Sequence, residues 1–126
     1  MVEEAQALGV QEIILGECGH GFRAFRWEGP NWTRQAYPLP VRSVLELLDE
    51  YFAAGRIRVD PAKNPERVTL HDPCNLVRWG GVSEPQRRVL GRCYADFAEM
   101  HPNRRNNYCC GGGGGMLSMS EYGQRR

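Results

Sequence analysis

The stretch NNYCCGGGGGMLS, residues 106–118, places two adjacent cysteines directly before five glycines. Glycine loses more conformational freedom on folding than any other residue, so five in a row cost stability and add no side chain to a core. A chain keeps such a run where something else needs the space. The run therefore indicates a loop that lies around a bulky group, and this expectation constrains the fold more than any other feature.

The five cysteines, an odd number, cannot all pair within the chain. Adjacent cysteines form a disulfide only with strain, and the sequence shows no secretion-signal pattern. Thiols in such a chain are more often ligands or redox groups than parts of a disulfide framework. We therefore expect a cytoplasmic protein whose cysteines stay reduced.

Composition excludes several classes of partner. The formal net charge of +1 gives no electrostatic reason to expect binding to nucleic acid or to an anionic membrane surface. No apolar run approaches the roughly 18 residues that a direct membrane span needs. Residues 2–8 resemble the tail of a helix and residues 116–126 a helix that has not ended, so we expect these 126 residues to be a piece of a longer polypeptide.

Alternating strand-like and helix-like segments predict an α/β fold, a small parallel sheet flanked by helices. Short apolar runs predict parallel strands of one sheet near 12–16 and 67–71, and amphipathic patterns predict helices packed on it near 41–54 and 84–95. Weaker signals predict a third strand within 97–102, an N-cap at Ser83, a C-cap at Gly55, and irregular or loop structure at 17–40 and 74–82.

The cysteines fall at corresponding places in this pattern. Cys18 and Cys74 each follow a predicted strand, whereas Cys109 and Cys110 precede a predicted helix. Ligands of parallel α/β sheets gather beyond the carboxyl ends of the strands, often against helix N-termini. We therefore expect these thiol-bearing loops to converge at one edge of the sheet.

Adjacent thiolates next to glycines suit a soft metal or an iron–sulfur cluster. The glycines let the backbone pass close to a bulky anion, and their N–H groups can hydrogen-bond its sulfurs. A flexible linker is the simpler alternative, and a phosphate-binding loop is disfavoured because no Lys-Ser/Thr follows the glycines. Tetrahedral zinc held by three thiolates plus His71 or Cys18 also remains open.

Other candidate residues have simpler structural interpretations. Cys93 lies within a predicted helix among apolar neighbours and is expected to be a buried structural thiol. His20 and His71 flank turns, where hydrogen-bonded structural histidines are more common than ligands. Arg104 and Arg105 could offset the charge of a cluster, although a solvated loop is the expected use.

The spacing of HDPC at 71–74, 34 intervening residues and CCGGGGG at 109–115 resembles the cysteine-rich CCG module. This module occurs in the catalytic subunit of heterodisulfide reductase, in iron–sulfur subunits of glycolate and lactate oxidases, and in anaerobic glycerol-3-phosphate dehydrogenase. The segments ECGHGFR, HDPCNL and EMHPNRRNNYCCGGGGGM look most like the DsrK branch, the heterodisulfide-reductase-like subunit of the membrane complex associated with dissimilatory sulfite reduction.

The resemblance implies a non-cubane [4Fe–4S] cluster in the parent protein. It implies Cys74, Cys109 and Cys110 as ligands, Gly111 and Gly112 as cluster-binding residues beside them, and Cys18 as a further candidate. It also implies that residues 1–40 end a preceding module and that 41–126 form a second one, cut before its closing Cys-x-x-Cys. We expect this piece alone to hold no cluster.

The resemblance further implies an electron-transfer subunit that reduces a disulfide or trisulfide on a small partner protein or thiol cofactor. Its other partners would be subunits of a membrane-anchored redox complex, with the chain at the cytoplasmic side of the membrane. Three alternatives remain open: an iron–sulfur subunit of a glycolate, lactate or glycerol-3-phosphate oxidoreductase, a structural zinc domain, and a docking domain with idle thiols.

Overall fold

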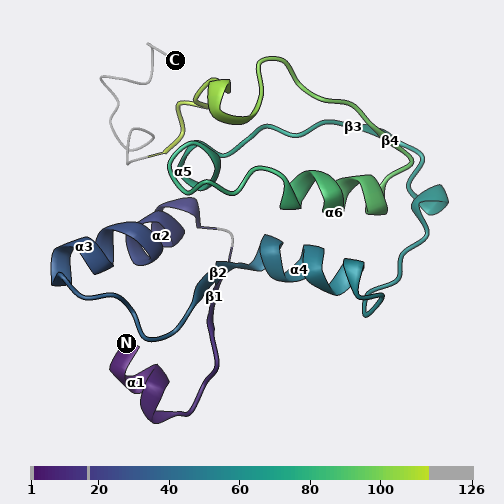
Figure 1. The fold of residues 1–126 in the computed structure, drawn as a ribbon. Helices are drawn as coiled ribbons and strands as arrows, with labels where there is room; N and C mark the ends of the chain where they lie inside the picture. Colours follow the sequence, from purple (N-terminus) through teal and green to yellow (C-terminus); the bar gives the residue numbers. More distant parts are fainter. Residues whose placement is uncertain (1, 17, 114–126) are drawn as a thin grey trace.

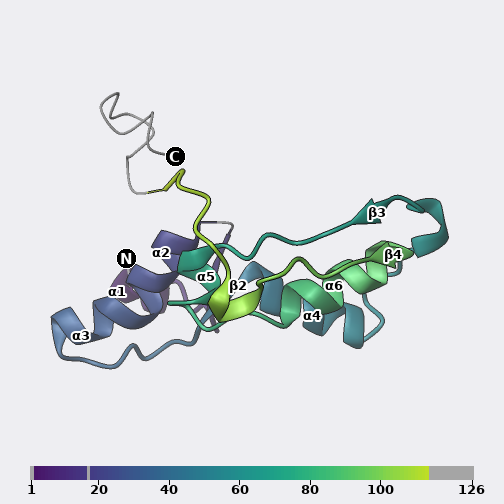
Figure 2. The same ribbon diagram turned by 90° about the horizontal axis from the view of Figure 1, so that it is seen from above.

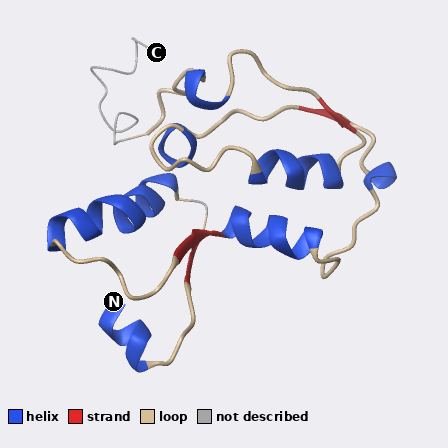
Figure 3. Ribbon diagram, in the orientation of Figure 1, coloured by secondary structure: helices blue, strands red, loops and turns tan. Residues whose placement is uncertain are grey.

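The computed structural model describes residues 2–16 and 18–113 of the chain, and the expected final helix lies outside them. The fold combines helices with short parallel strands, which confirms the predicted class (Figures 1 and 3). The helices are α1 (Val2–Ala7), α2 (Gly19–Arg23), α3 (Gly29–Thr33), α4 (Val44–Ala53), α5 (Cys74–Val77) and α6 (Pro85–Cys93). The strands are β1 (Ile13–Leu15), β2 (Val41–Ser43), β3 (Arg67–Val68) and β4 (Asp96–Phe97).

The strands form two separate parallel pairs in the described chain, β1 with β2 and β3 with β4. The prediction that 12–16 and 67–71 share one sheet was therefore wrong. Strand β1 instead pairs with residues 41–43, which the sequence pattern had assigned to the start of a helix. Val41 fits the apolar spacing of that helix as well as it fits a strand, so the pattern could not separate the two. The third strand, predicted within 97–102, is instead Asp96–Phe97 and overlaps the prediction only at Phe97.

Residues 19–33 are helical, although glycines and prolines had predicted loop and irregular structure there. The helices α2 and α3 are joined by a π-helical turn, Ala24–Glu28. The Cys18 thiol accepts a hydrogen bond from the Gly21 amide at the start of α2, and Pro30 lies in the first turn of α3, where its missing N–H costs little. The glycines and prolines that had predicted loop structure thus lie at the starts of helices. The expected loop 74–82 similarly begins with the short helix α5.

A buried serine, Ser43, starts the central helix α4. Its side chain accepts from the Leu45 amide, while the Glu46 carboxylate accepts from the Ser43 amide at 2.8 Å, which makes a complete capping box. The helix ends at Ala53 with Ala54 as its C-cap, one residue before the predicted Gly55, which follows with φ of +68°, a conformation that favours glycine. The second long helix, α6, begins after Glu84 rather than at the predicted Ser83 cap.

The core lies where the helices meet. Helices α4 and α6 run side by side in both views and are joined by an ion pair between Arg88 and Asp49 at 2.6 Å (Figures 1 and 2). Helix α2 packs on α5, and Phe22, Leu76 and Val82 form the buried apolar cluster between these segments. No helix among the described residues is both long and apolar enough to cross a membrane.

The capping box yields a stability prediction. We expect Ser43→Ala to lower the free energy of unfolding by about 1 kcal/mol, because the Leu45 amide loses its acceptor at a fully buried position. Urea unfolding monitored by circular dichroism measures the change. Thr69→Ala, which removes an exposed hydroxyl, should alter it by less than about 0.5 kcal/mol. Equal effects of the two substitutions would contradict the assigned role of the cap.

Candidate functional site

Three of the candidate ligands, Cys74, Cys109 and Cys110, line one cavity of about 180 Å³ at the start of α5. The cavity is lined by Gly19, His20, His71, Pro73, Cys74, Asn75, Cys109, Cys110 and Gly113. Segments that are far apart in the sequence therefore meet there: the start of α2, the HDPC turn and the Cys-Cys-Gly run. The expected convergence of Cys74 with the cysteine pair is present in the structure.

The glycine run already donates to the thiols. The Gly111 amide lies 3.4 Å from the Cys109 sulfur, and the Gly112 amide lies 3.4 Å from the Cys110 sulfur. Amide donors stabilise negative charge on sulfur, the use expected for these two glycines. Gly114 and Gly115 lie outside the described residues.

The two remaining cysteines do not line the cavity. Cys18 is exposed and its sulfur accepts from the Gly21 amide at 3.3 Å, so it serves as the N-cap of α2. His20, two residues further along, lines the cavity instead. Cys93 is half-buried near the end of α6, where its carbonyl accepts from the Asn64 side chain. It does not line the cavity, and it is less buried than the buried structural thiol that the sequence predicted.

Both cavity histidines are hydrogen-bonded, as predicted. His71 Nε2 lies 3.0 Å from the Tyr108 carbonyl oxygen and 3.3 Å from the Asn107 side-chain nitrogen. One ring nitrogen cannot donate to the first group and accept from the second at the same time. The carbonyl oxygen can only accept and its contact is the shorter one, so we assign the proton of neutral His71 to Nε2, while the Asn107 nitrogen donates to the Asp72 carbonyl at 2.5 Å. This bond ties the HDPC turn to the residue before Cys109.

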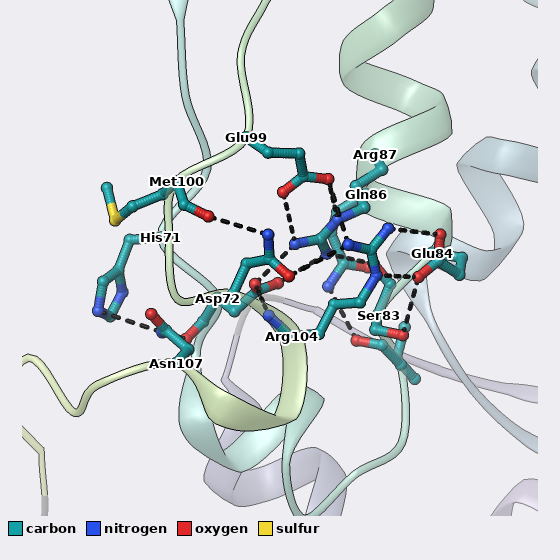
Figure 4. Close-up of polar contacts among 12 residues, drawn as sticks. His71, Asp72, Ser83, Glu84, Gln86, Arg87, Glu99, Met100, Arg104 and Asn107 are labelled. Carbon is teal, nitrogen blue, oxygen red and sulfur yellow. Dashed lines mark hydrogen bonds and ion pairs between the residues drawn. The ribbon is translucent and has the colours of Figure 1, made fainter.

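A buried ion pair anchors the HDPC turn (Figure 4). The Asp72 carboxylate is fully buried and accepts from both terminal nitrogens of Arg87 at 2.8 and 2.7 Å. The Arg87 guanidinium also donates to Glu99, at 2.6 Å from Nε, and to the Ser83 carbonyl at 2.6 Å. Bidentate pairing with further hydrogen bonds is what makes such a pair tolerable away from water.

The same carboxylate positions the loop that leads to the cysteine pair. Asp72 Oδ2 accepts from the Arg104 backbone amide at 2.5 Å, at the start of the 3₁₀ turn Arg104–Asn106. Arg78, which follows α5, donates to the Arg105 and Asn107 carbonyls. The backbone before Cys109 is thus held against α5, whose first residue is Cys74. The Arg104 side chain pairs with Glu84 at 2.7 Å while both side chains stay more than 40% exposed, and Arg105 is exposed, in agreement with the expected solvated loop.

Charge and burial act in opposite directions on the Asp72 carboxyl. Burial alone favours the protonated form, but hydrogen bonds from Arg87 and from the Arg104 amide outweigh it, so the pKa of Asp72 lies below its ordinary value. Hydrogen bonding to Asp72 correspondingly raises the pKa of Arg87 against the effect of its own burial. Both groups stay charged near neutral pH, and the turn keeps its anchor.

The cavity does not have the geometry of a site for one metal ion. Among residues 2–16 and 18–113, no three His, Cys, Asp or Glu side chains converge closely enough to hold a single ion. The thiols of Cys74, Cys109 and Cys110 instead lie around a shared space. Soft thiolates with backbone N–H donors beside them fit an iron–sulfur group, and the described residues supply three of the five thiolates that the resemblance implies.

Sequence reasoning missed the residues that hold this arrangement. Arg23, Asn75 and Asn107 lie within the segments that carry the resemblance, but no role was assigned to them, and Arg87 lies in none of these segments. A weak signal was available for Asn75, which directly follows the candidate ligand Cys74. No signal distinguished Arg87 from the other arginines of α6.

We predict that Asp72→Asn lowers the free energy of unfolding by about 3 kcal/mol at pH 7, because Arg87 loses a buried anionic partner. The native pKa of Asp72 is depressed, so its contribution is complete above the unfolded-state pKa of about 3.9 and is lost as pH falls through the native value. The difference between wild type and variant should therefore shrink in acid. Urea unfolding at several pH values measures it.

The matched control is Asp96→Asn, since Asp96 pairs with Arg67 at 3.8 Å while both side chains are more than half exposed. This substitution should cost at most about 1 kcal/mol. A difference for Asp72→Asn that stays constant into strong acid would contradict the depressed pKa.

Comparison with known proteins identifies the cysteine-rich segment. Residues 68–126 match the family model described as CCG, cysteine-rich domain. The "Hdr-like menaquinol oxidoreductase iron-sulfur subunit" of Archaeoglobus profundus is 33% identical over 130 aligned positions, which cover 78% of this chain and 23% of that protein. One component of the dihydromethanophenazine:CoB–CoM heterodisulfide reductase of Methanosarcina acetivorans is 33% identical over 89 residues, 71% of this chain and 21% of that protein.

The chain thus spans less than a quarter of the length of these curated relatives. No solved structure matches it significantly. The matched segment begins at β3 and includes the HDPC turn, α6 and the Cys-Cys-Gly run, so it contains every cysteine that lines the cavity. Residues 68–126 thus carry a cysteine-rich CCG domain, and the chain is similar to an Hdr-like iron–sulfur subunit and to a heterodisulfide reductase subunit.

Proposed function

We propose that this chain is the cluster-binding part of a heterodisulfide-reductase-like electron-transfer subunit. In the full protein, Cys74, Cys109 and Cys110 would hold a non-cubane [4Fe–4S] cluster together with thiolates beyond the described residues. The observation that carries the proposal is the single cavity lined by these three thiols, with Gly111 and Gly112 amides donating to two of the sulfurs. When bound, the cluster would supply one-electron redox chemistry at this cavity.

The residues of the chain would prepare the site for a sulfur-containing substrate. The glycine amides would stabilise thiolate charge, and the absence of side chains at 111–113 leaves room for a bulky group against the backbone. The buried Asp72–Arg87 pair would keep the HDPC turn and the Cys-Cys-Gly run in one relative position while electrons enter and leave. Rigid support of this kind limits the rearrangement that accompanies a change of charge.

The proposed electron acceptor is a disulfide or trisulfide on a small partner protein or thiol cofactor. The name of one relative includes a CoB–CoM heterodisulfide, and the other relative is named a menaquinol oxidoreductase, so both names describe redox proteins. Within this family we assign the chain to the DsrK branch, on the resemblance of its ECGHGFR and HDPCNL segments. Such a subunit would work at the cytoplasmic side of a membrane, attached through partner subunits.

A cysteine series in the full protein tests the cluster. Replacing Cys74, Cys109 or Cys110 singly with alanine should remove most of the bound iron and acid-labile sulfide and the associated EPR signal of anaerobically purified protein. Cys93→Ala is the matched control, because Cys93 lies away from the cavity, and it should keep the wild-type iron content. Iron loss in the control, or zinc with no iron in the wild type, would refute the assignment.

Cys18 gives a separate prediction. Because its sulfur caps α2 outside the cavity, we expect Cys18→Ala to keep the cluster and to lower the free energy of unfolding by about 1 kcal/mol. Cys18→Ser should restore part of that stability, since a hydroxyl also accepts from the Gly21 amide. Iron analysis and urea unfolding of the two variants measure both effects, and loss of iron from Cys18→Ala would make Cys18 a ligand after all.

A further inference from the structure

The side chain of Asn75 joins three groups beside the cavity. Arg23 donates from Nη1 to the Asn75 carbonyl oxygen at 2.9 Å. The amide nitrogen of Asn75 lies 2.8 Å from His20 Nε2 and 3.7 Å from the Cys74 sulfur, a long contact that the size of sulfur permits. One carboxamide therefore connects α2 to the candidate ligand at the start of α5.

The orientation of this carboxamide follows from chemistry. A guanidinium only donates, so the Asn75 oxygen must face Arg23 and the nitrogen must face the other two groups. Arg23 also forms an ion pair with Glu28, with its Nε 2.8 Å from a carboxylate oxygen, although the N–H is not aligned for a hydrogen bond. Each hydrogen of the Asn75 amide then has an acceptor, one on His20 and one on Cys74. His20 Nε2 accepts, which leaves the proton of the neutral ring on Nδ1.

The His20 ring also contacts the glycine run. A Cβ atom built at Gly113 would lie 3.3 Å from Cε1 and 3.7 Å from Nε2 of His20. The edge of the ring that receives the Asn75 hydrogen bond therefore occupies the space where a side chain at 113 would begin. His20, Asn75 and the glycines form one connected wall next to Cys74.

We propose that Asn75 is a positioning residue of the redox site: it fixes the His20 tautomer and donates to the Cys74 thiolate, and Arg23 holds it in the orientation that allows both. The part that concerns redox chemistry rests on the proposed function, whereas the part that concerns the histidine does not. A hydrogen bond to a ligand sulfur stabilises the more negative, reduced state of a cluster, so Asn75 raises the reduction potential.

The first experiment needs no metal. Long-range ¹H–¹⁵N spectra of the ¹⁵N-histidine-labelled protein before metal loading, at a pH where imidazole is neutral, report the tautomer of each ring, and His20→Gln assigns the His20 signal. His20 should carry its proton on Nδ1, whereas His71 should carry it on Nε2 because it donates to the Tyr108 carbonyl. Asn75→Leu should move the His20 proton toward Nε2.

The control for this substitution is Asn64→Leu. Asn64 is also a half-buried asparagine, and it donates to the Cys93 carbonyl away from the cavity. The Asn64→Leu substitution should leave the His20 signal unchanged. A wild-type His20 with its proton on Nε2, or no change on Asn75→Leu, would overturn the assigned hydrogen bond.

The second experiment measures the reduction potential of the metal-loaded full protein by EPR-monitored titration. Asn75→Leu, which removes both donors, and Asn75→Asp, which adds negative charge, should lower the potential. Arg23→Gln should lower it less, because the carboxamide stays but can rotate. Arg42→Gln is the control, since Arg42 makes similar ion pairs, with Glu12 and Glu50, far from the cavity, and it should not change the potential.

The outcomes separate the two proposals. Absence of iron from the wild-type protein would refute the proposed function. The hydrogen bond between Asn75 and His20 would still be tested by the tautomer measurement, which needs no metal. If Asn75→Leu prevents metal loading, Arg23→Gln decides, because it leaves every residue that lines the cavity in place. A potential in Arg23→Gln equal to that of Arg42→Gln, or unchanged potentials in both Asn75 variants, would overturn the redox role of Asn75.

Discussion

The arrangement of the site depends on one buried ion pair, Asp72 with Arg87. The two side chains are 0% and 6% exposed, and each would be costly away from water without full partners. Arg87 meets this requirement completely: its five N–H donors face five contacts, two to Asp72, two to Glu99 and one to the Ser83 carbonyl. Because so many hydrogen bonds fix the ion pair in a single arrangement, they also fix the conformation of the turn between β3 and α5.

That geometry explains how the chain tolerates a costly glycine run. The Asp72 carboxylate accepts from the Arg104 amide, the Asp72 carbonyl accepts from the Asn107 side chain, and Arg78 donates to the Arg105 and Asn107 carbonyls. Ordering the residues before Cys109 costs conformational entropy. Hydrogen bonds outside the glycine run, within the 3₁₀ turn and the HDPC turn, offset this cost. The glycines need only close the cavity, and their amides are free to face the cysteine sulfurs.

The sequence predicted which cysteines converge better than it predicted the framework around them. Two adjacent cysteines before glycines, and a third after a short apolar run, are local patterns with few structural uses, so their convergence could be anticipated. The strand pairing could not, because two-residue strands such as β3 and β4 carry almost no periodic signal. The helical character of 19–33 was hidden by glycines and prolines that lie at helix starts. Arg87 and Asn75 act through partners distant in sequence, and no local pattern reveals such contacts.

The cavity also shows that the segment before residue 40 takes part in the site. Gly19 and His20 line it together with residues of the cysteine-rich domain, and β1 pairs with β2 across the predicted boundary at 40/41. The approach is close: a Cβ atom at Gly19 would lie 2.9 Å from the Leu76 amide nitrogen, so any side chain there would push α2 away from α5. Because His20 and Arg23 reach Asn75 only while these helices touch, contact between α2 and α5 holds one side of the cavity in place, and the cavity extends upstream of the matched domain.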